Sequence, residues 1–329
     1  MKKSLLMLPV AAFLLAGCSG NNQKEEQKGE EGGNPSQEVI DTSKNVLCPA
    51  GAPTLTLVDL IVSDRVEVTQ NTTDIPGQFA KGDYAYIVFD STNATKLLAK
   101  QGENAKYEFT KMLTGGNFHL FGFDKTTEDT PKDEDNIIGF NEAATPGKLV
   151  KNIYPEVKTF DQNFDGVTQV RDTLLALTPE SEKPDWAVIA DPVATAVGNQ
   201  LKNKGISYVD INLQTEFANK NEAWDKDYIC QAGLFVNKEY KAKNPKSVEQ
   251  TLSTINGTID KIFSNLEEIE STITKHYADA KAQTAALGYA FAAVKGAQGP
   301  NSTKNGVGVV PNNVTFTVED INNFNTILG

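Results

Sequence analysis

One stretch of the sequence spaces oxygen-bearing side chains in the manner of a calcium-binding loop. Asp161, Asn163 and Asp165 stand at positions one, three and five, Gly166 at six and Asp172 at twelve. Such loops ligate calcium through these positions, turn sharply at the glycine and usually end on a bidentate glutamate. Here position twelve is an aspartate, position eight is not aliphatic, and the preceding residues have a strand pattern. We therefore favour a strand-to-helix turn with Asp165 as the helix N-cap, and expect no metal site.

Other catalytic or metal chemistry is not indicated. The sequence has two histidines, His119 and His276, and two cysteines beyond its N-terminal region, Cys48 and Cys230. A zinc site needs more ligands at suitable spacing, and no nucleophile elbow, P-loop or complete dinucleotide fingerprint occurs. We expect His119 to pair within a strand, and we predict no catalytic residue, no cofactor and no enzyme activity. Thiols so far apart in sequence give no evidence of proximity, so we favour two separate buried cysteines over a disulfide.

Five loops carry small and polar residues where predicted strands end. They are Pro49–Pro53, Asp90–Asn93, Gly115–Asn117, Asn141–Gly147 and Ala190–Thr195. In open α/β sheets, ligands bind beyond the carboxyl ends of the strands, where helix N-termini present free N–H groups. Turns need the same residue types, so each loop alone is weak evidence. Together the five loops indicate a crevice for a small ligand.

The elements that would position these loops alternate between short β-like and helix-like runs, which is typical of an α/β protein with largely parallel sheets. The predicted strands are Asn45–Cys48, Arg65–Thr69, Tyr84–Phe89, Tyr107–Leu113, Phe118–Phe123, Ile137–Phe140, Val157–Phe160, Trp186–Ile189, Ile206–Ile211 and Tyr228–Val236. The predicted helices are Thr54–Val62, Ile75–Lys81, Ala94–Gln101, Lys148–Ile153, Val167–Leu177 and Val193–Lys202. The β-branched composition of Thr54–Val62 also suits a strand, but the alternating rhythm favours a helix.

The C-terminal third has a helical pattern. Apolar residues recur at steps of three and four at Val248, Leu252, Ile255, Ile259, Ile262, Leu266, Ile269 and Ile273. This spacing predicts one or two amphipathic helices, which we expect to pack onto a lobe rather than to form a coiled coil. Ala278–Lys295 and Val318–Leu328 are predicted as further helices.

Length and charge narrow the classes of function. The part of the chain from Lys44 onward holds about 285 residues, which suits two lobes better than one small core. The formal net charge is −12. Nucleic-acid binding requires basic patches, and none is visible, so we expect no nucleic-acid partner.

The N-terminus has the order of an export signal. Two lysines precede an apolar run from Leu5 to Leu15 and then small residues; the run is too short to span a bilayer. Leu15-Ala16-Gly17-Cys18 resembles a bacterial lipobox, which implies that residues 1–17 are removed and that Cys18 is lipidated. An ordinary secretory signal with an incidental cysteine is the alternative. Residues 18–44 have the polar composition of a flexible tether, so we expect the protein on the cell membrane, facing outside the cytoplasm.

Several of the loops also carry a resemblance to a known family. The segments LCPAGAPTLTL, FAKGDYAYIVFDSTNATKLL, IIGFNEAATPGKLVKNI, DWAVIADPVATAV and LFVNKEYKAKNPKSVEQTL are similar to those of solute-binding lipoproteins of ABC importers. The narrower similarity is to the group that includes sulfonate-, nitrate- and thiamine-precursor-binding proteins. Its most specific parts are Thr145-Pro146, the run Ala190–Thr195 and Lys243-Asn244-Pro245. The chain departs from the family at Asp191, where glutamate is more common, and in its acidic Asp124–Asn136 insertion.

The resemblance implies a two-lobe type II periplasmic-binding-protein fold, with mixed sheets flanked by helices and a ligand cleft between the lobes. It places residues 45–132 and 238–329 in lobe one and residues 133–237 in lobe two. It implies a monomer that captures a small solute, closes over it by a hinge motion and delivers it to an ABC permease. A surface lipoprotein with an adhesin or sensor role and a thiamine-pyrimidine-related enzyme are the alternatives.

Seven residues are the expected ligand contacts: Gly51, Ser91, Asn93, Asn117, Asn141, Thr145 and Asp191. Backbone N–H groups of Gly51, Ser91 and Thr145 are suited to an anionic group, and the asparagine amides to orienting the ligand. Glu142 and Asp191 favour instead a ligand with a cationic or amino part, so the charge of the ligand stays open. Phe118, Tyr154 and Trp186 are candidate stacking surfaces, although each also suits the core.

Overall fold

The computed structural model describes residues 45–297 and 307–329. The expected signal sequence (residues 1–17), the lipidation site Cys18 and the tether up to residue 44 lie outside the described residues. Among the helices that are described, none combines the length and apolarity needed to cross a membrane.

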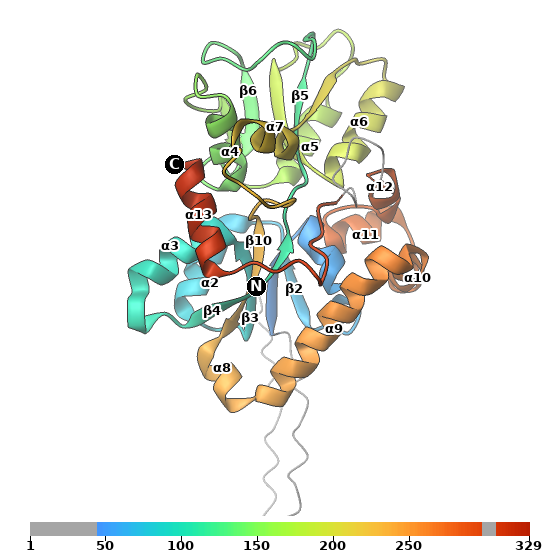
Figure 1. The fold of residues 1–329 in the computed structure, drawn as a ribbon. Helices are drawn as coiled ribbons and strands as arrows, with labels where there is room; N and C mark the ends of the chain where they lie inside the picture. Colours follow the sequence, from blue (N-terminus) through green and yellow to red (C-terminus); the bar gives the residue numbers. More distant parts are fainter. Residues whose placement is uncertain (1–44, 298–306) are drawn as a thin grey trace, which may run out of the picture. The chain divides into compact units, whose positions relative to one another are not determined.

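The first of two five-stranded sheets is mixed (Figure 1). Its strands are, in spatial order, β2 (Val66–Thr69), β1 (Val46–Pro49), β3 (Tyr86–Asp90), β10 (Ala232–Asn237) and β4 (Tyr107–Thr114). The first three run parallel, whereas β10 is antiparallel to both of its neighbours. Every residue of β10 is buried, as expected for a central strand covered on both faces.

The second sheet repeats this arrangement. Its strands are, in spatial order, β7 (Gln162–Phe164), β6 (Ile137–Phe140), β8 (Trp186–Ala190), β5 (Phe118–Gly122) and β9 (Val209–Asn212). Here β6, β7 and β8 are parallel, and β5 is antiparallel to β8 and β9. The register of β5 sets His119 opposite Ile189 on one side and Asn212 on the other.

The chain passes between the sheets at two adjacent segments. Gly115–Asn117 leads from β4 to β5, and residues 229–231 lead back to β10. The two segments are joined because the Ile229 N–H donates to the Gly115 carbonyl oxygen at 3.2 Å. The crossings differ from the expected lobe boundaries at residues 132 and 238, since β5 belongs to the second sheet and β10 to the first.

Helices follow most strands. In the first half they are η1 (Ala52–Leu57), α1 (Val58–Ile61), η2 (Thr72–Asp74), α2 (Ile75–Lys81), α3 (Ser91–Gln101), η3 (Gly102–Asn104), α4 (Thr145–Ile153), α5 (Val167–Leu175), α6 (Val193–Asn203) and α7 (Leu213–Lys220). The C-terminal part adds α8 (Lys238–Lys243), α9 (Pro245–Ser264), α10 (Leu266–His276), α11 (Ala280–Leu287), α12 (Phe291–Gly296) and α13 (Val318–Leu328).

Most predicted elements are confirmed, but α8 lies outside the predicted helices, β10 begins at Ala232 rather than Tyr228, and α3 begins at Ser91 rather than Ala94. Thr54–Val62 is helical, as favoured. The strand predicted at Val157–Phe160 is wrong: the strand is β7, and α7 was not predicted. The helix predicted over Ala278–Lys295 is two helices, because α11 ends at Gly288, whose φ of 91° is left-handed. The helix predicted from Lys148 begins at Thr145.

The C-terminal helices serve both sheets. The apolar stripes of α9 and α10 pack on η1 and α1, which confirms packing on a lobe. By contrast, α12 packs against α6 of the second sheet, and α13 (red in Figure 1) contacts both α3 and α4. Asn325 on α13 donates to the Thr92 carbonyl oxygen, and Asn152 on α4 donates to that of Ile327. The last helix therefore contacts elements that belong to both sheets.

Candidate functional site

A cavity of about 360 Å³ lies between the two sheets. Its walls come from the segments that follow β1, β3, β6, β7 and β8, so the carboxyl ends of strands from both sheets face it. Four of the five loops singled out from the sequence contribute several residues each, and Gly115–Asn117 contributes Asn117. The volume lies in the range of small-molecule sites, so the expected crevice is present where the strand ends predicted it.

Five of the seven expected contact residues line this cavity. They are Gly51, Asn93, Asn117, Asn141 and Asp191. Ser91 and Thr145 are fully buried and do not line it. That these five touch a ligand stays a prediction.

The backbone donors expected to hold an anion are already used. The N–H of Gly51 donates to the Leu287 carbonyl oxygen at 2.9 Å, and that of Ser91 to the Gln231 carbonyl oxygen at 2.8 Å. The N–H of Thr145 donates to Asp90 Oδ2 at 3.2 Å. In this structure none of the three is available to an anionic ligand, which corrects that part of the interpretation.

Asp90 connects the two sheets beside the cavity. As the N-cap of α3, its Oδ1 accepts from the Asn93 N–H at 2.9 Å and from Thr92 Oγ1. Its Oδ2 accepts from Thr145 Oγ1 at 2.6 Å. Because Thr145 opens α4 on the second sheet, one carboxylate fixes two helix N-termini.

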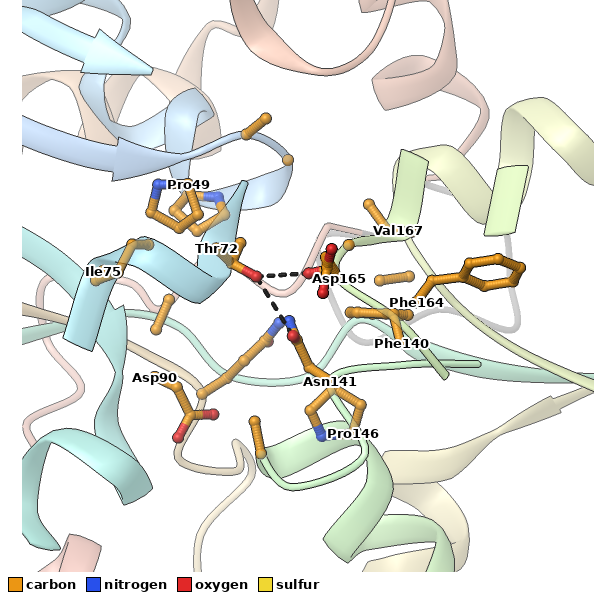
Figure 2. Close-up of a pocket in the computed structure, with 18 of the residues that line it drawn as sticks. Pro49, Thr72, Ile75, Asp90, Phe140, Asn141, Pro146, Phe164, Asp165 and Val167 are labelled. Atoms are coloured by element: carbon orange, nitrogen blue, oxygen red, sulfur yellow. Dashed lines mark hydrogen bonds between the residues drawn. The ribbon is translucent and has the colours of Figure 1, made fainter. Parts of the chain in front are cut away.

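Asn141 and Thr72 meet across the cavity (Figure 2). Thr72 Oγ1 lies 2.5 Å from the Asp165 carbonyl oxygen, to which it donates, and 3.3 Å from Asn141 Oδ1. Asn141 has a left-handed φ of 48°, a conformation that asparagine tolerates better than most residues. Sequence reasoning missed Thr72 and the place of Asp165 in the wall, since their meeting depends on how the sheets face each other.

His119 is buried and contacts Asp191, a residue of the cavity wall. The Nε2 atom of His119 lies 3.1 Å from Asp191 Oδ2, and the Nδ1 atom lies 2.8 Å from Asp210 Oδ1. Burial alone would lower the pKa of His119, but the hydrogen bonds to the two carboxylates outweigh it and raise the pKa to about 10. At neutral pH His119 is therefore an imidazolium between two carboxylates. One ring nitrogen contacts Asp191, which follows β8, and the other contacts Asp210 on β9.

Four phenylalanines provide the aromatic wall. Phe89, Phe118, Phe140 and Phe164 line the cavity, so Phe118 lies where expected. Trp186 and Tyr154 do not line it: Trp186 is fully buried in the core, and Tyr154 lines a separate surface pocket.

The remaining candidates have structural roles. Cys48 and Cys230 are free and buried, as favoured, and burial raises the pKa of both thiols. The calcium-like stretch is β7 followed by α5, which confirms a strand-to-helix turn, but the N-cap is Gly166 rather than Asp165. No group of three or more potential metal-ligating side chains occurs among residues 45–297 and 307–329.

Comparison with known proteins gives structural matches only. No family model and no curated protein matches this chain. An ABC transporter protein from Parabacteroides distasonis matches at 14% identity, 78% of this chain, 91% of that chain and a TM-score of 0.52. The alkanesulfonate-binding protein SsuA from Xanthomonas axonopodis pv. citri, bound to MOPS, matches at 12%, 85%, 88% and 0.52.

A third match concerns the fold itself. A Candida albicans protein, described as defining a new family with the generic periplasmic binding protein fold, matches at 10% identity over 87% of this chain and 90% of its own, with a TM-score of 0.53. These similarities concern the fold and not the ligand. With the two mixed sheets and the two crossings, the described chain has the type II periplasmic-binding-protein fold.

Proposed function

We propose that this protein is an extracytoplasmic solute-binding protein that captures a small solute in the inter-sheet cavity and passes it to an ABC permease. The observation that best supports this function is the cavity of about 360 Å³ at the carboxyl ends of strands from both sheets. Two crossing segments connect these sheets. Capture needs recognition without chemistry. His119 suits this because its two ring nitrogens are engaged by carboxylates and it does not line the cavity.

Binding would involve movement of one lobe against the other. The crossings at residues 115–117 and 229–231 are the covalent connections between the sheets within the described range, and they supply a hinge. The contacts of Thr72 and Asp90 to the second sheet would then form on closure. Gly51, Asn93, Asn117, Asn141 and Asp191 are the proposed contacts, with Ser91 and Thr145 supporting them from behind.

The test of capture uses protein taken from its own host. Native mass spectrometry of the full chain should detect a bound solute, and adding that solute after removal should raise the melting temperature. A ligand at one hundred times its Kd stabilises by about 2.7 kcal/mol. Deleting the gene should reduce uptake of the same solute; unchanged uptake together with solute-free protein would contradict the proposal.

We further propose that Cys18 carries a lipid that holds the monomer on the outer face of the cell membrane. The support is the Leu15–Cys18 motif followed by a polar tether. Cys18→Ser should release the chain into the medium, or into the periplasm where an outer membrane is present. Unchanged membrane fractionation of this variant would exclude the lipid anchor.

A further inference from the structure

The cavity wall carries one sign of charge. Asp90, Glu142, Asp165 and Asp191 line it, and none of its described lining residues is a lysine, arginine or histidine. A cleft lined by one sign of charge between low-dielectric walls concentrates ligands of the opposite sign. What matters is how much of this charge is already neutralised within the protein.

Only part of the negative charge is paired. Glu142 lies 2.6 Å from Lys151 Nζ. The protonated His119 side chain pairs with both Asp191 and Asp210. These three side chains together therefore retain a net charge of −1.

The other two carboxylates differ in their surroundings. Asp90 forms no ion pair with residues 45–297 or 307–329 but has Lys148 nearby, whose Nζ lies 3.2 Å from Asn93 Oδ1. The Asp165 side chain has no hydrogen bond or ion pair with any described residue. The surroundings of the cavity therefore remain negative.

The side-chain amide of Asn117 gives independent evidence about the ligand. Asn117 lines the cavity and is 2% exposed. Its Nδ2 donates to the Asp191 carbonyl oxygen at 2.6 Å, which fixes the orientation of the amide. Its Oδ1 is buried and has no partner among the described residues. A buried acceptor left without a donor is destabilising, so this position favours a ligand that donates a hydrogen bond to it.

The rest of the lining is largely apolar. Phe118, Phe140 and Phe164 contribute rings, and Ile75 and Val193 contribute aliphatic groups. Such walls accept a compact hydrophobic body, and aromatic faces also attract cations. Charge, hydrogen bonding and shape thus point to one class of ligand.

We propose that the captured solute is a cation: a compact, largely apolar molecule with a protonated amine, placed toward Asp165 and donating to Asn117. Oxyanions such as carboxylates and sulfonates are disfavoured, because the three backbone donors expected for them are occupied and the wall is negative. The inference rests on the proposed function, since it specifies the ligand of the same cavity.

The experiment compares probes that differ only in their charged group. Phenylethylamine, 3-phenylpropionate and 2-phenylethanesulfonate form one set, and tryptamine and indole-3-propionate form another. Each is titrated into the purified full chain by calorimetry, at two salt concentrations. We expect at least one amine to bind more than tenfold more tightly than its anionic counterparts, with an affinity that falls as salt rises.

Variants test whether the wall charge is responsible. Asp165→Asn should weaken amine binding about two- to tenfold, the range of a partly screened ion pair, without affecting the fold. Asp225→Asn, an exposed aspartate outside the cavity, is the matched control and should leave the affinity unchanged.

The failure of this inference is distinguishable from failure of the proposed function. Tighter binding of an anionic probe, or no amine binding at millimolar concentration, overturns the charge assignment. An anionic solute in the mass spectrum of the native protein also overturns it while supporting capture. An amine in that spectrum supports both proposals.

Discussion

At the scale of single residues, Asp90 is the side chain on which the N-termini of α3 and α4 beside the cavity depend. Its carboxylate accepts from Thr92 and Asn93 on α3 and from both the N–H and the hydroxyl of Thr145 on α4. Other caps in this chain serve only one helix. Asp279, which accepts from the Ala282 N–H at the start of α11, is one of these.

Asp90→Ala should therefore destabilise the protein more than an ordinary cap mutation. Loss of a cap costs about 1 kcal/mol, and the buried Thr145 hydroxyl would lose its partner at a further cost of about 1–3 kcal/mol. Urea unfolding of Asp90→Ala and of the control Asp279→Ala measures the difference. Equal losses for the two variants would mean that the link to Thr145 contributes no stability.

The stability of the protein should depend on pH through His119. Its pKa is raised to about 10 in the folded protein, against about 6.5 in the unfolded chain. A raised pKa stabilises fully below the unfolded value, and this contribution is lost as pH rises through the folded value. The free energy of unfolding attributable to His119 should thus fall between about pH 6.5 and pH 10.

The measurement compares wild type with His119→Gln over this pH range. The stability difference between them should shrink as pH rises. His276→Gln, at the exposed second histidine, controls for other titrating groups. A difference that stays constant with pH would show that His119 is neutral in the folded state.

At the scale of elements, the Asn141–Gly147 loop depends on close backbone approach. A Cβ on Gly147 would lie 2.1 Å from the Glu142 carbonyl oxygen. Because backbone atoms cannot move aside cheaply, Gly147→Ala should destabilise the protein by about 1–3 kcal/mol and weaken solute binding by displacing Asn141.

Gly257 provides the matched control for this substitution. It lies within α9, and a Cβ there would meet nothing within 4 Å. Gly257→Ala should stabilise by up to about 1 kcal/mol, because alanine is the better helix former. Thermal unfolding of both variants measures whether the changes in stability have opposite signs. If both substitutions destabilise the protein, close backbone approach at Gly147 is not the cause.

The elements also show what sequence patterns predict and what they miss. Val157 and Phe160 lie in a predicted strand, and both are buried. However, the Phe160 ring covers Gly139 on β6, and the backbone that pairs with β6 belongs to Gln162–Phe164, where the first two residues are polar. An edge strand needs only one partner and little apolar surface, so its pattern is weak.

Local signals were sufficient elsewhere. The cap residue Asp90 and the glycine after Lys81 give α3 and α2 recognisable ends, and the stripe of α9 follows the helical period. At α7, Asn212 caps the helix and Leu213 and Phe217 are spaced by four, a signal that was present but not used. The meeting of Thr72 with Asn141 is long-range, and neither residue type indicates it.

At the scale of the whole molecule, side-chain contacts cross the cavity from one sheet to the other. Thr72 follows β2 of the first sheet, and both oxygens near its hydroxyl belong to residues that follow β6 and β7 of the second sheet. A hydroxyl has one proton, so the shorter contact, to the Asp165 carbonyl oxygen, is the hydrogen bond. Such a bond contributes about 0.5–1.5 kcal/mol, which is enough to change the population of a two-state equilibrium about two- to tenfold.

Thr72→Val keeps the side-chain shape and removes the hydroxyl, so it should favour the open arrangement. We expect faster solute dissociation, by about two- to tenfold, and a larger radius of gyration in solution scattering of the ligand-free protein. Thr326→Val removes an exposed hydroxyl whose bond stays within α13 and should change neither. Because Asn325 and Asn152 tie α13 to both lobes, the opening must also move this helix. A Thr72→Val protein with unchanged dissociation and scattering would mean that α13, rather than the contact across the cavity, holds the lobes together.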